Sequence, residues 1–192
     1  MEERTGERHI ADVRTSHGLV VEFQHSYIDP NERRAREGFY KTMTWVVDGM
    51  RLKRDLNRFI RGKQDLRPFG SKVYVTEFPE ELLPPAWVGS LVPVIFDFMV
   101  TPPNDNAQED FPLYCLLPNR LGYSSVIAEV SRIDFIGMVT RGQWVPWVNN
   151  LITQIEQKNA ESRNKAIQYT AGAASLNNPS GRRRGYRRGR IF

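Results

Sequence analysis

The chain has 192 residues, of which 40% are hydrophobic and 11% aromatic, enough for the core of one ordinary globular domain. Its single cysteine, Cys115, excludes an internal disulfide, and its three histidines have no recognised zinc-finger or zinc-ribbon spacing. The formal net charge is +5, no apolar run approaches the roughly 18 to 20 residues that span a bilayer, and the amino terminus lacks a signal-peptide core, so we expect a soluble, cytoplasmic protein with no membrane partner.

Two segments near the amino terminus alternate polar and apolar side chains. They are residues 8–14 (RHIADVR) and residues 20–26 (VVEFQHS), and turn-forming residues separate them. The pattern predicts a β-hairpin whose loop is Ser16 to Gly18, with Gly18 in the left-handed conformation that such loops need. In that register Asp12 lies opposite Glu22.

A helix is predicted directly after the hairpin. Asp29 has the chemistry of an N-cap, Pro30 suits the first helical position, and Glu32 completes a capping box. Its buried stripe is predicted from the helical spacing of Ala35, Phe39 and Met43.

Strands and helices then alternate irregularly to residue 169. A short strand is predicted over residues 44–47, and Leu52, Leu56, Phe59 and Ile60 mark a second helix. Further strands are predicted over residues 72–76, 93–99, 113–117 and 126–135, followed by a last helix over residues 144–169 with apolar positions at Trp147, Leu151 and Ile155.

The carboxyl-terminal residues 170–192 form a basic tail. No acid follows Glu161, whereas Arg163, Lys165 and six later arginines do, so the rest of the chain is net acidic. The tail has no apolar periodicity, and we expect it to stay disordered until it meets a polyanion, for which nucleic acid is the first candidate. The alternative is a solvated tail that only aids solubility. The six arginines are Arg182, Arg183, Arg184, Arg187, Arg188 and Arg190.

The predicted hairpin brings two carboxylates together. Opposed side chains on one face of a hairpin lie about 4.5 to 5.5 Å apart at Cβ, so Asp12 and Glu22 converge, and Gln24 shares their face. Val21 and Phe23 are expected to point into the core. A divalent ion such as Mg²⁺ commonly occupies a carboxylate pair, where it acidifies a bound water. The alternative is an exposed hairpin face that happens to carry two acids.

The stretch GERHIADVRTSHGLVVEFQHSYIDPNERRAREGFYKTMTWVVDGMRLKRDLNRF resembles the nuclease-like core of the competence protein CoiA family. That family is similar to the PD-(D/E)XK nucleases, in which an Asp on one strand and a Glu-X-Lys on the next bind metal and activate water. Here Asp12 matches the first acid, and Glu22-Phe23-Gln24 matches the Glu-X-Gln of CoiA-like sequences. The resemblance covers roughly residues 6–60 and, more loosely, continues to about residue 145.

The resemblance implies a restriction-endonuclease-like α/β (α+β) fold, a mixed sheet flanked by helices, over residues 1–169. Within it we expect a core over residues 6–60, a strand-rich extension over 70–140 and a helix over 144–169. The superfamily core begins with a helix and a first strand, and only eleven residues precede Asp12 here. These elements are therefore expected to be missing, and the exposed sheet edge predicts self-association or a partner segment.

The resemblance also implies a function: Mg²⁺- or Mn²⁺-dependent hydrolysis of DNA with Asp12, Glu22 and Gln24 as the catalytic residues, in DNA uptake, recombination or defence. Similar nucleases touch the phosphate with the following helix, which makes Arg33, Arg36 and Tyr40 candidates. The alternative for that helix is a solvated face with Glu32–Arg36 and Arg33–Glu37 pairs. For the whole protein, the alternatives are a catalytically impaired nucleic-acid-binding protein and an accessory protein that contacts a recombinase.

Three other polar residues were expected to have structural roles. His25, by its parity in the strand, is predicted to be a satisfied core histidine, and Asp48 of the Asp-Gly pair to form a turn. Asp97 interrupts an apolar run, so it must be paired or exposed.

Overall fold

The structure is a computed structural model that describes residues 10–99 and 112–176. The six tail arginines lie outside the described residues. Contacts divide the chain into two units, Met1–Ile155 and Glu156–Phe192. The helices are α1 (Pro30–Tyr40), α2 (Lys53–Gly62), α3 (Arg132–Thr140) and α4 (Trp144–Leu176), and the strands are β1 (Val13–Arg14), β2 (Val20–Gln24), β3 (Met43–Asp48), β4 (Arg67–Gly70), β5 (Val73–Thr76), β6 (Val94–Asp97), β7 (Pro112–Leu121) and β8 (Ser124–Ser131). Short 3-10 turns occupy Lys63–Asp65, Pro79–Glu81 and Pro85–Trp87.

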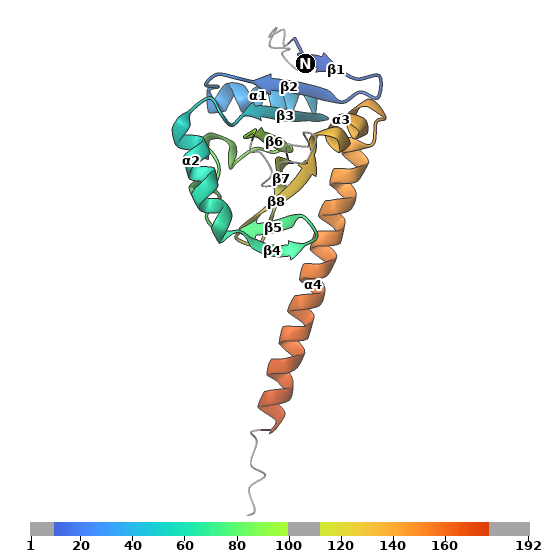
Figure 1. Cartoon of the computed structure of the whole chain (residues 1–192). Coiled ribbons are helices and arrows are strands. Elements are labelled where there is room, and N and C mark those ends of the chain that lie inside the picture. Colours follow the sequence, from blue (N-terminus) through green and yellow to red (C-terminus); the bar gives the residue numbers. More distant parts are fainter. Residues whose placement is uncertain (1–9, 100–111, 177–192) are drawn as a thin grey trace, which may run out of the picture. The chain divides into compact units, whose positions relative to one another are not determined.

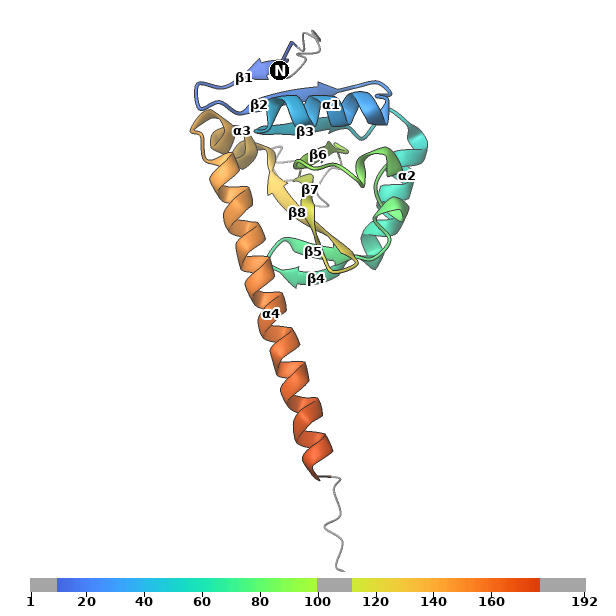
Figure 2. The same ribbon diagram turned by 180° about the vertical axis from the view of Figure 1, so that it is seen from behind.

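The strands form one mixed sheet in the order β1-β2-β3-β6-β7-β8-β5-β4 (Figure 1). β2, β3 and β6 are parallel, whereas every other neighbouring pair is antiparallel. The crossover from β2 to β3 runs through α1, which lies along these two strands in both views (Figures 1 and 2). A mixed sheet flanked by helices is thereby confirmed as the architecture.

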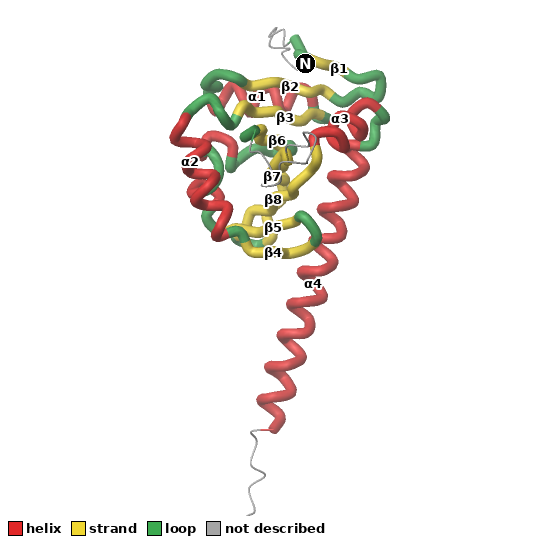
Figure 3. Tube along the Cα trace, in the orientation of Figure 1, coloured by secondary structure: helices red, strands yellow, loops and turns green. Residues whose placement is uncertain are grey.

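The two faces of the sheet bury separate cores. One contains Val20 and Trp45 from the sheet with Phe59 from α2, and the other contains Val21 from the sheet with Phe135 from α3 and Trp144 from α4. Figure 3 shows how the helices and strands alternate along the trace. Among the described residues, no helix is long and apolar enough to cross a membrane.

Helix α1 begins as predicted, but its buried face is not the predicted one. The Asp29 side chain accepts hydrogen bonds from the backbone N–H groups of Asn31 and Glu32. Ala35 and Phe39 are exposed, whereas Arg33 and Glu37 are buried. The cause lies beneath the helix, where Glu22 and the indole N–H of a tryptophan need polar partners that an apolar stripe could not supply.

Two predicted boundaries, one missed strand and one buried position also differ from the observed structure. Met43 begins β3 and is not part of α1. The predicted strand over residues 126–135 ends at Ser131, whose hydroxyl accepts a hydrogen bond from the Asp134 N–H and caps α3. Strand β4, which contains a proline and a glycine, was not predicted. In α2, Phe59 is buried as expected, but Ile60 is 49% exposed.

Candidate functional site

The hairpin has the predicted register. Val13 pairs with Val21 and Arg14 with Val20, so Asp12, one residue further out, lies beside Glu22. Gly18 closes the loop with a φ of 83°. The loop also packs on the turn between α3 and α4, because a Cβ on Gly142 would fall 2.6 Å from the His17 ring. The hairpin is therefore anchored at its loop end.

Asp12 is exposed and bridges the two strands. Its Oδ2 accepts a hydrogen bond of 2.8 Å from the backbone N–H of Phe23. This bond holds the carboxylate at the edge of β2, next to Glu22 along the strand. Phe23 itself is 44% exposed, so the prediction that it points into the core is wrong. In the described part of the chain, β1 is the edge strand of the sheet, and no further strand pairs with it.

Glu22 is buried beneath α1, with 1% of its surface exposed. Its Oε2 accepts a hydrogen bond of 2.8 Å from Arg36 Nη1, whereas its Oε1 has no hydrogen-bond partner within the described ranges. Burial raises the pKa of the Glu22 carboxyl above its ordinary value, and the charge of Asp12 raises it further, while Arg36 and the nearby backbone N–H of Asp12 act in the opposite direction. Hereafter Asp12 and Glu22 are called the carboxylate pair.

Two residues of α1 join the carboxylate pair. Arg36 bridges Glu22 and Glu32, with Nη2 2.9 Å from Glu32 Oε1. The pKa of Tyr40 is raised, first by burial and then by the negative charge of Glu22. The resemblance named both residues as phosphate-contacting candidates; Arg36 bonds Glu22 directly, whereas Tyr40 is coupled to Glu22 through charge.

Arg33 lies in a different cluster. Only 3% of its surface is exposed, its Nε lies 3.7 Å from Glu37 Oε1, and its guanidinium lies over the Trp87 ring at 5.8 Å. The Arg33–Glu37 pair of the alternative interpretation thus forms, but it is buried, so that part of the solvated-face prediction is wrong. A buried guanidinium engaged in this way is not displayed to a phosphate.

Gln24 ends β2 two residues after Glu22. Its Nε2 donates to the backbone oxygen of Ser26 at 2.9 Å and to the Ser26 hydroxyl at 3.1 Å. These two hydrogen bonds use the amide nitrogen. The amide oxygen is left to accept a hydrogen bond from a donor such as water. The turn after β2 therefore fixes the orientation of this side chain.

The carboxylate pair offers two groups that could serve as ligands for a metal. Mg²⁺ characteristically takes one or two carboxylates and completes its shell with water and substrate phosphate. The unpartnered Oε1 of Glu22 fits that donor set. In the described ranges, no three His, Cys, Asp or Glu side chains come together as a complete metal cage.

The other polar residues that the sequence singled out lie elsewhere. The His25 side chain is 73% exposed, 3.6 Å from an Asp48 oxygen, so the core-histidine prediction is wrong. The Asp48 carboxylate accepts from the Met50 N–H, which confirms its turn role. Asp97 is paired, with Oδ2 2.7 Å from Arg132 Nη2.

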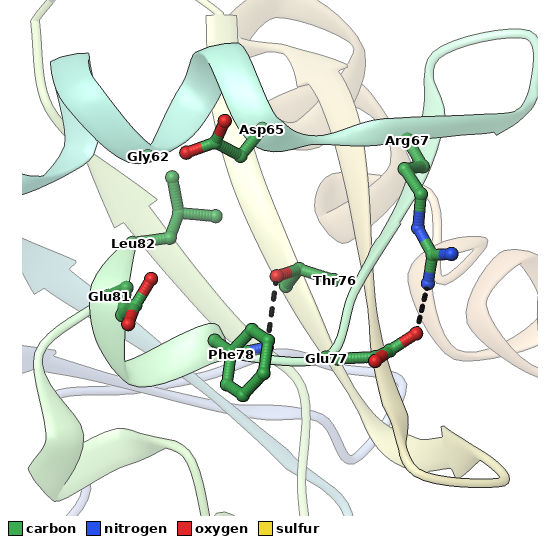
Figure 4. A pocket seen from close by; sticks show the side chains of 8 residues that line it. All are labelled: Gly62, Asp65, Arg67, Thr76, Glu77, Phe78, Glu81 and Leu82. Carbon is green, nitrogen blue, oxygen red and sulfur yellow. Dashed lines mark hydrogen bonds and ion pairs between the residues drawn. The ribbon is translucent and has the colours of Figure 1, made fainter.

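Two surface hollows were not predicted from the sequence. One, of about 300 Å³, lies between the end of α2 and the segment after β5, where Glu77 pairs with Arg67 at 2.7 Å (Figure 4). The other, of about 660 Å³, is rich in cations. We call it the basic groove; it is lined by Tyr27, Arg51, Leu52, Lys53, Arg54, Asp55, Arg58, Pro84, Pro85 and Ala86. The basic run RLKRDLNR at residues 51–58 is visible in the sequence and could have indicated this groove.

Comparisons of the chain with protein-family models, with curated proteins and with solved structures find no match.

Proposed function

We propose that this chain is a metal-dependent nuclease of the CoiA-like, PD-(D/E)XK type, which hydrolyses phosphodiester bonds in DNA. The observation that supports the proposal is the hairpin, which sets exposed Asp12 beside buried Glu22 and leaves one Glu22 oxygen without a hydrogen-bond partner among the described residues. A buried acid with a raised pKa and an unsatisfied oxygen is unfavourable in a purely structural site. The parallel β2-α1-β3 crossover that follows agrees with the expected fold.

Asp12 and Glu22 would hold Mg²⁺ or Mn²⁺, which on binding polarises the phosphodiester and acidifies a bound water. Arg36 favours the ionised form of Glu22 and holds the carboxylate in place through its 2.8 Å bond. Gln24 would orient this water by accepting a hydrogen bond from it with its amide oxygen, because Ser26 already holds the amide nitrogen. Tyr40 follows Arg36 by one helical turn and is near enough for the charge of Glu22 to raise its pKa.

A second candidate is a nucleic-acid-binding protein without catalysis. The Arg36–Glu22 ion pair favours it, because Arg36 already neutralises the buried carboxylate without any metal. Further proposals rest on the resemblance and on the sequence alone. They are a role in DNA uptake, recombination or defence, a recombinase partner, self-association through the β1 edge and a cytoplasmic location.

The test is cleavage of circular and linear DNA by the full chain in Mg²⁺, in Mn²⁺ and in EDTA. Asp12→Asn and Glu22→Gln keep the shape of each side chain and remove its charge. We expect both to abolish metal-dependent cleavage and to leave DNA affinity within about threefold of the wild type, since neither grips phosphate.

Glu32→Gln is the matched control, because Glu32 also bonds Arg36 but is about half exposed and outside the carboxylate pair. It should cleave as the wild type does. Cleavage that survives both Asp12→Asn and Glu22→Gln, or binding without any metal-dependent cleavage in the wild type, would overturn the nuclease proposal. The latter result would favour the binding protein.

A further inference from the structure

The basic groove lies beyond the carboxyl ends of two parallel strands. Tyr27 follows the end of β2 by three residues, and Arg51 follows the end of β3 by three. Pro84 and Pro85, which come from the segment before β6, form part of its lining. In open α/β sheets ligands characteristically bind outside the carboxyl ends of the strands. Gln24, at the end of β2, belongs to the same edge of the sheet.

The groove carries an excess of positive charge. Four of its lining residues are cations, and Asp55 is the only acid among them. Asp55 is already paired, with Oδ1 2.9 Å from Arg58 and 3.8 Å from Arg54. Arg51 and Lys53 are exposed and have no ion pair in the described part of the chain. A cleft of one charge sign raises the local concentration of the opposite ion.

The start of α2 adds to this positive potential. The N-cap residue is Leu52, whose side chain cannot accept a hydrogen bond, so the first-turn N–H groups lack a side-chain cap. Lys53 and Arg54 occupy the first turn, where cations oppose the helix dipole, and the acid of that turn, Asp55, is paired with Arg54 and Arg58. Such an arrangement weakens the helix when it stands alone and is relieved by an anion.

Tyr27 presents an aromatic side chain to the groove and is 69% exposed. An exposed ring among cations matches the chemistry of single-stranded nucleic acid, which offers phosphates to the cations and an unstacked base to the ring. Duplex DNA offers phosphates but no free base face. We infer that the basic groove binds a single-stranded segment of nucleic acid, with phosphates at Arg51 and Lys53 and a base stacked on Tyr27.

This inference rests on the proposed function only in taking nucleic acid as the ligand. It adds a binding track at the sheet edge to which Gln24 belongs, and it favours a single-stranded or locally unpaired substrate. It does not depend on a metal at the carboxylate pair. Its test is therefore made in EDTA, where cleavage does not contribute.

The experiment measures binding of the full chain to a labelled single-stranded oligonucleotide at several salt concentrations. For Arg51→Gln/Lys53→Gln we expect weaker binding and a smaller slope of log affinity against log salt, by about 0.7 for each lost phosphate contact. The control, Arg61→Gln/Lys72→Gln, removes the same charge from exposed positions outside the groove. It should leave the slope unchanged. Thermal melts should agree among the variants.

Tyr27→Leu separates stacking from charge. We expect about 5- to 150-fold weaker binding of the single strand, with an unchanged salt slope and little effect on a duplex of the same sequence. Tyr123→Leu, at a tyrosine outside the groove that is even more exposed, is the control and should have no effect.

Equal slopes for both double variants would overturn the groove as the binding surface. Equal losses for single strand and duplex in Tyr27→Leu, or no loss in either, would overturn the single-stranded ligand. Groove-dependent binding in a chain that never cleaves DNA would support this inference and refute the nuclease proposal. Cleavage that is lost in the carboxylate-pair variants but unchanged in the groove variants would support the nuclease proposal and refute this inference.

Discussion

Two buried carboxylates lie between helix α1 and the sheet, Glu37 on the helix and Glu22 on β2, and their surroundings differ. Glu37 accepts hydrogen bonds from Trp45 Nε1 at 3.2 Å, from the Ser90 hydroxyl at 2.8 Å and from the Leu91 N–H at 3.1 Å, and Arg33 lies beside it. Glu22 is as deeply buried, but it has Arg36 on one oxygen and, in the part of the chain that the structure describes, no hydrogen-bond partner on the other. We call the first group, centred on Glu37, the Glu37 network.

The difference separates a structural acid from a candidate functional one. Hydrogen bonds around Glu37 offset the cost of burying its charge and tie α1 to β3 and to the segment before β6. The surroundings of Glu22 leave part of that cost unmet and raise its pKa. A residue that lowers stability in the resting protein is typical of sites kept for chemistry.

Breaking the Glu37 network should have the largest effect on stability. We expect Glu37→Ala to lower the free energy of unfolding by about 3 to 5 kcal/mol, because it strands three donors and the buried Arg33 charge. Urea denaturation measures the change. Glu32→Ala is the matched control on the same helix and should cost less than about 0.5 kcal/mol. A loss below about 1 kcal/mol for Glu37→Ala would contradict the structural role.

Removal of the negative charge at Glu22 should have a much smaller effect on stability. Glu22→Gln removes an incompletely paired buried charge, and Arg36 keeps its bond to Glu32. We expect the free energy of unfolding to stay within about 1 kcal/mol of the wild type or to rise, while cleavage is lost. A loss of stability as large as that of Glu37→Ala would show that Glu22 is another structural acid.

The raised pKa of Glu22 sharpens this comparison through pH. The folded chain holds the Glu22 proton at pH values where the unfolded chain has released it, so this group's contribution to stability falls as pH rises above 4.5. The stability advantage of Glu22→Gln over the wild type should therefore grow with pH across that window and then level off. Urea denaturation from about pH 4 to pH 7 measures it. An advantage that shrinks with rising pH would contradict the direction of the shift.

The smallest expected effect is at Gln24. Gln24→Lys places an amine where the CoiA-like pattern has an amide, and the half-buried strand end can accommodate its flexible stem. We expect metal-dependent cleavage to be retained or raised, since an amine adds positive charge beside the attacked phosphate. Single-turnover cleavage rates measure the change. A rate as low as that of Asp12→Asn would show that the amide oxygen itself is required.

Local patterns predicted the parts of this fold that depend on neighbours in the chain. Alternation and Gly18 specified the hairpin register, and with it the approach of Asp12 to Glu22. Asp29 and Pro30 specified the start of α1. Each is a short-range signal whose physical cause lies within a few residues.

Long-range partners determined what the sequence could not predict. The buried face of α1 is polar because Glu22, Trp45 and Ser90 lie beneath it. These three residues lie far apart in the sequence, so no local pattern shows that they meet. The cations of the basic groove form a visible run, but the walls at Pro84 and Pro85 come from elsewhere in the chain. Apolar periodicity alone predicted that Phe39 is buried in the core, but in the structure its side chain is 57% exposed.

Metal binding to the carboxylate pair tests the central claim most directly. Electron paramagnetic resonance of Mn²⁺ titrated with the full chain measures the bound fraction without requiring turnover. We predict saturable binding in the wild type and in Glu32→Gln, and its loss in Asp12→Asn and in Glu22→Gln, because only the latter two remove a ligand. Equal Mn²⁺ binding by all four proteins, or none by the wild type, would contradict the assignment of Glu22 as the functional acid.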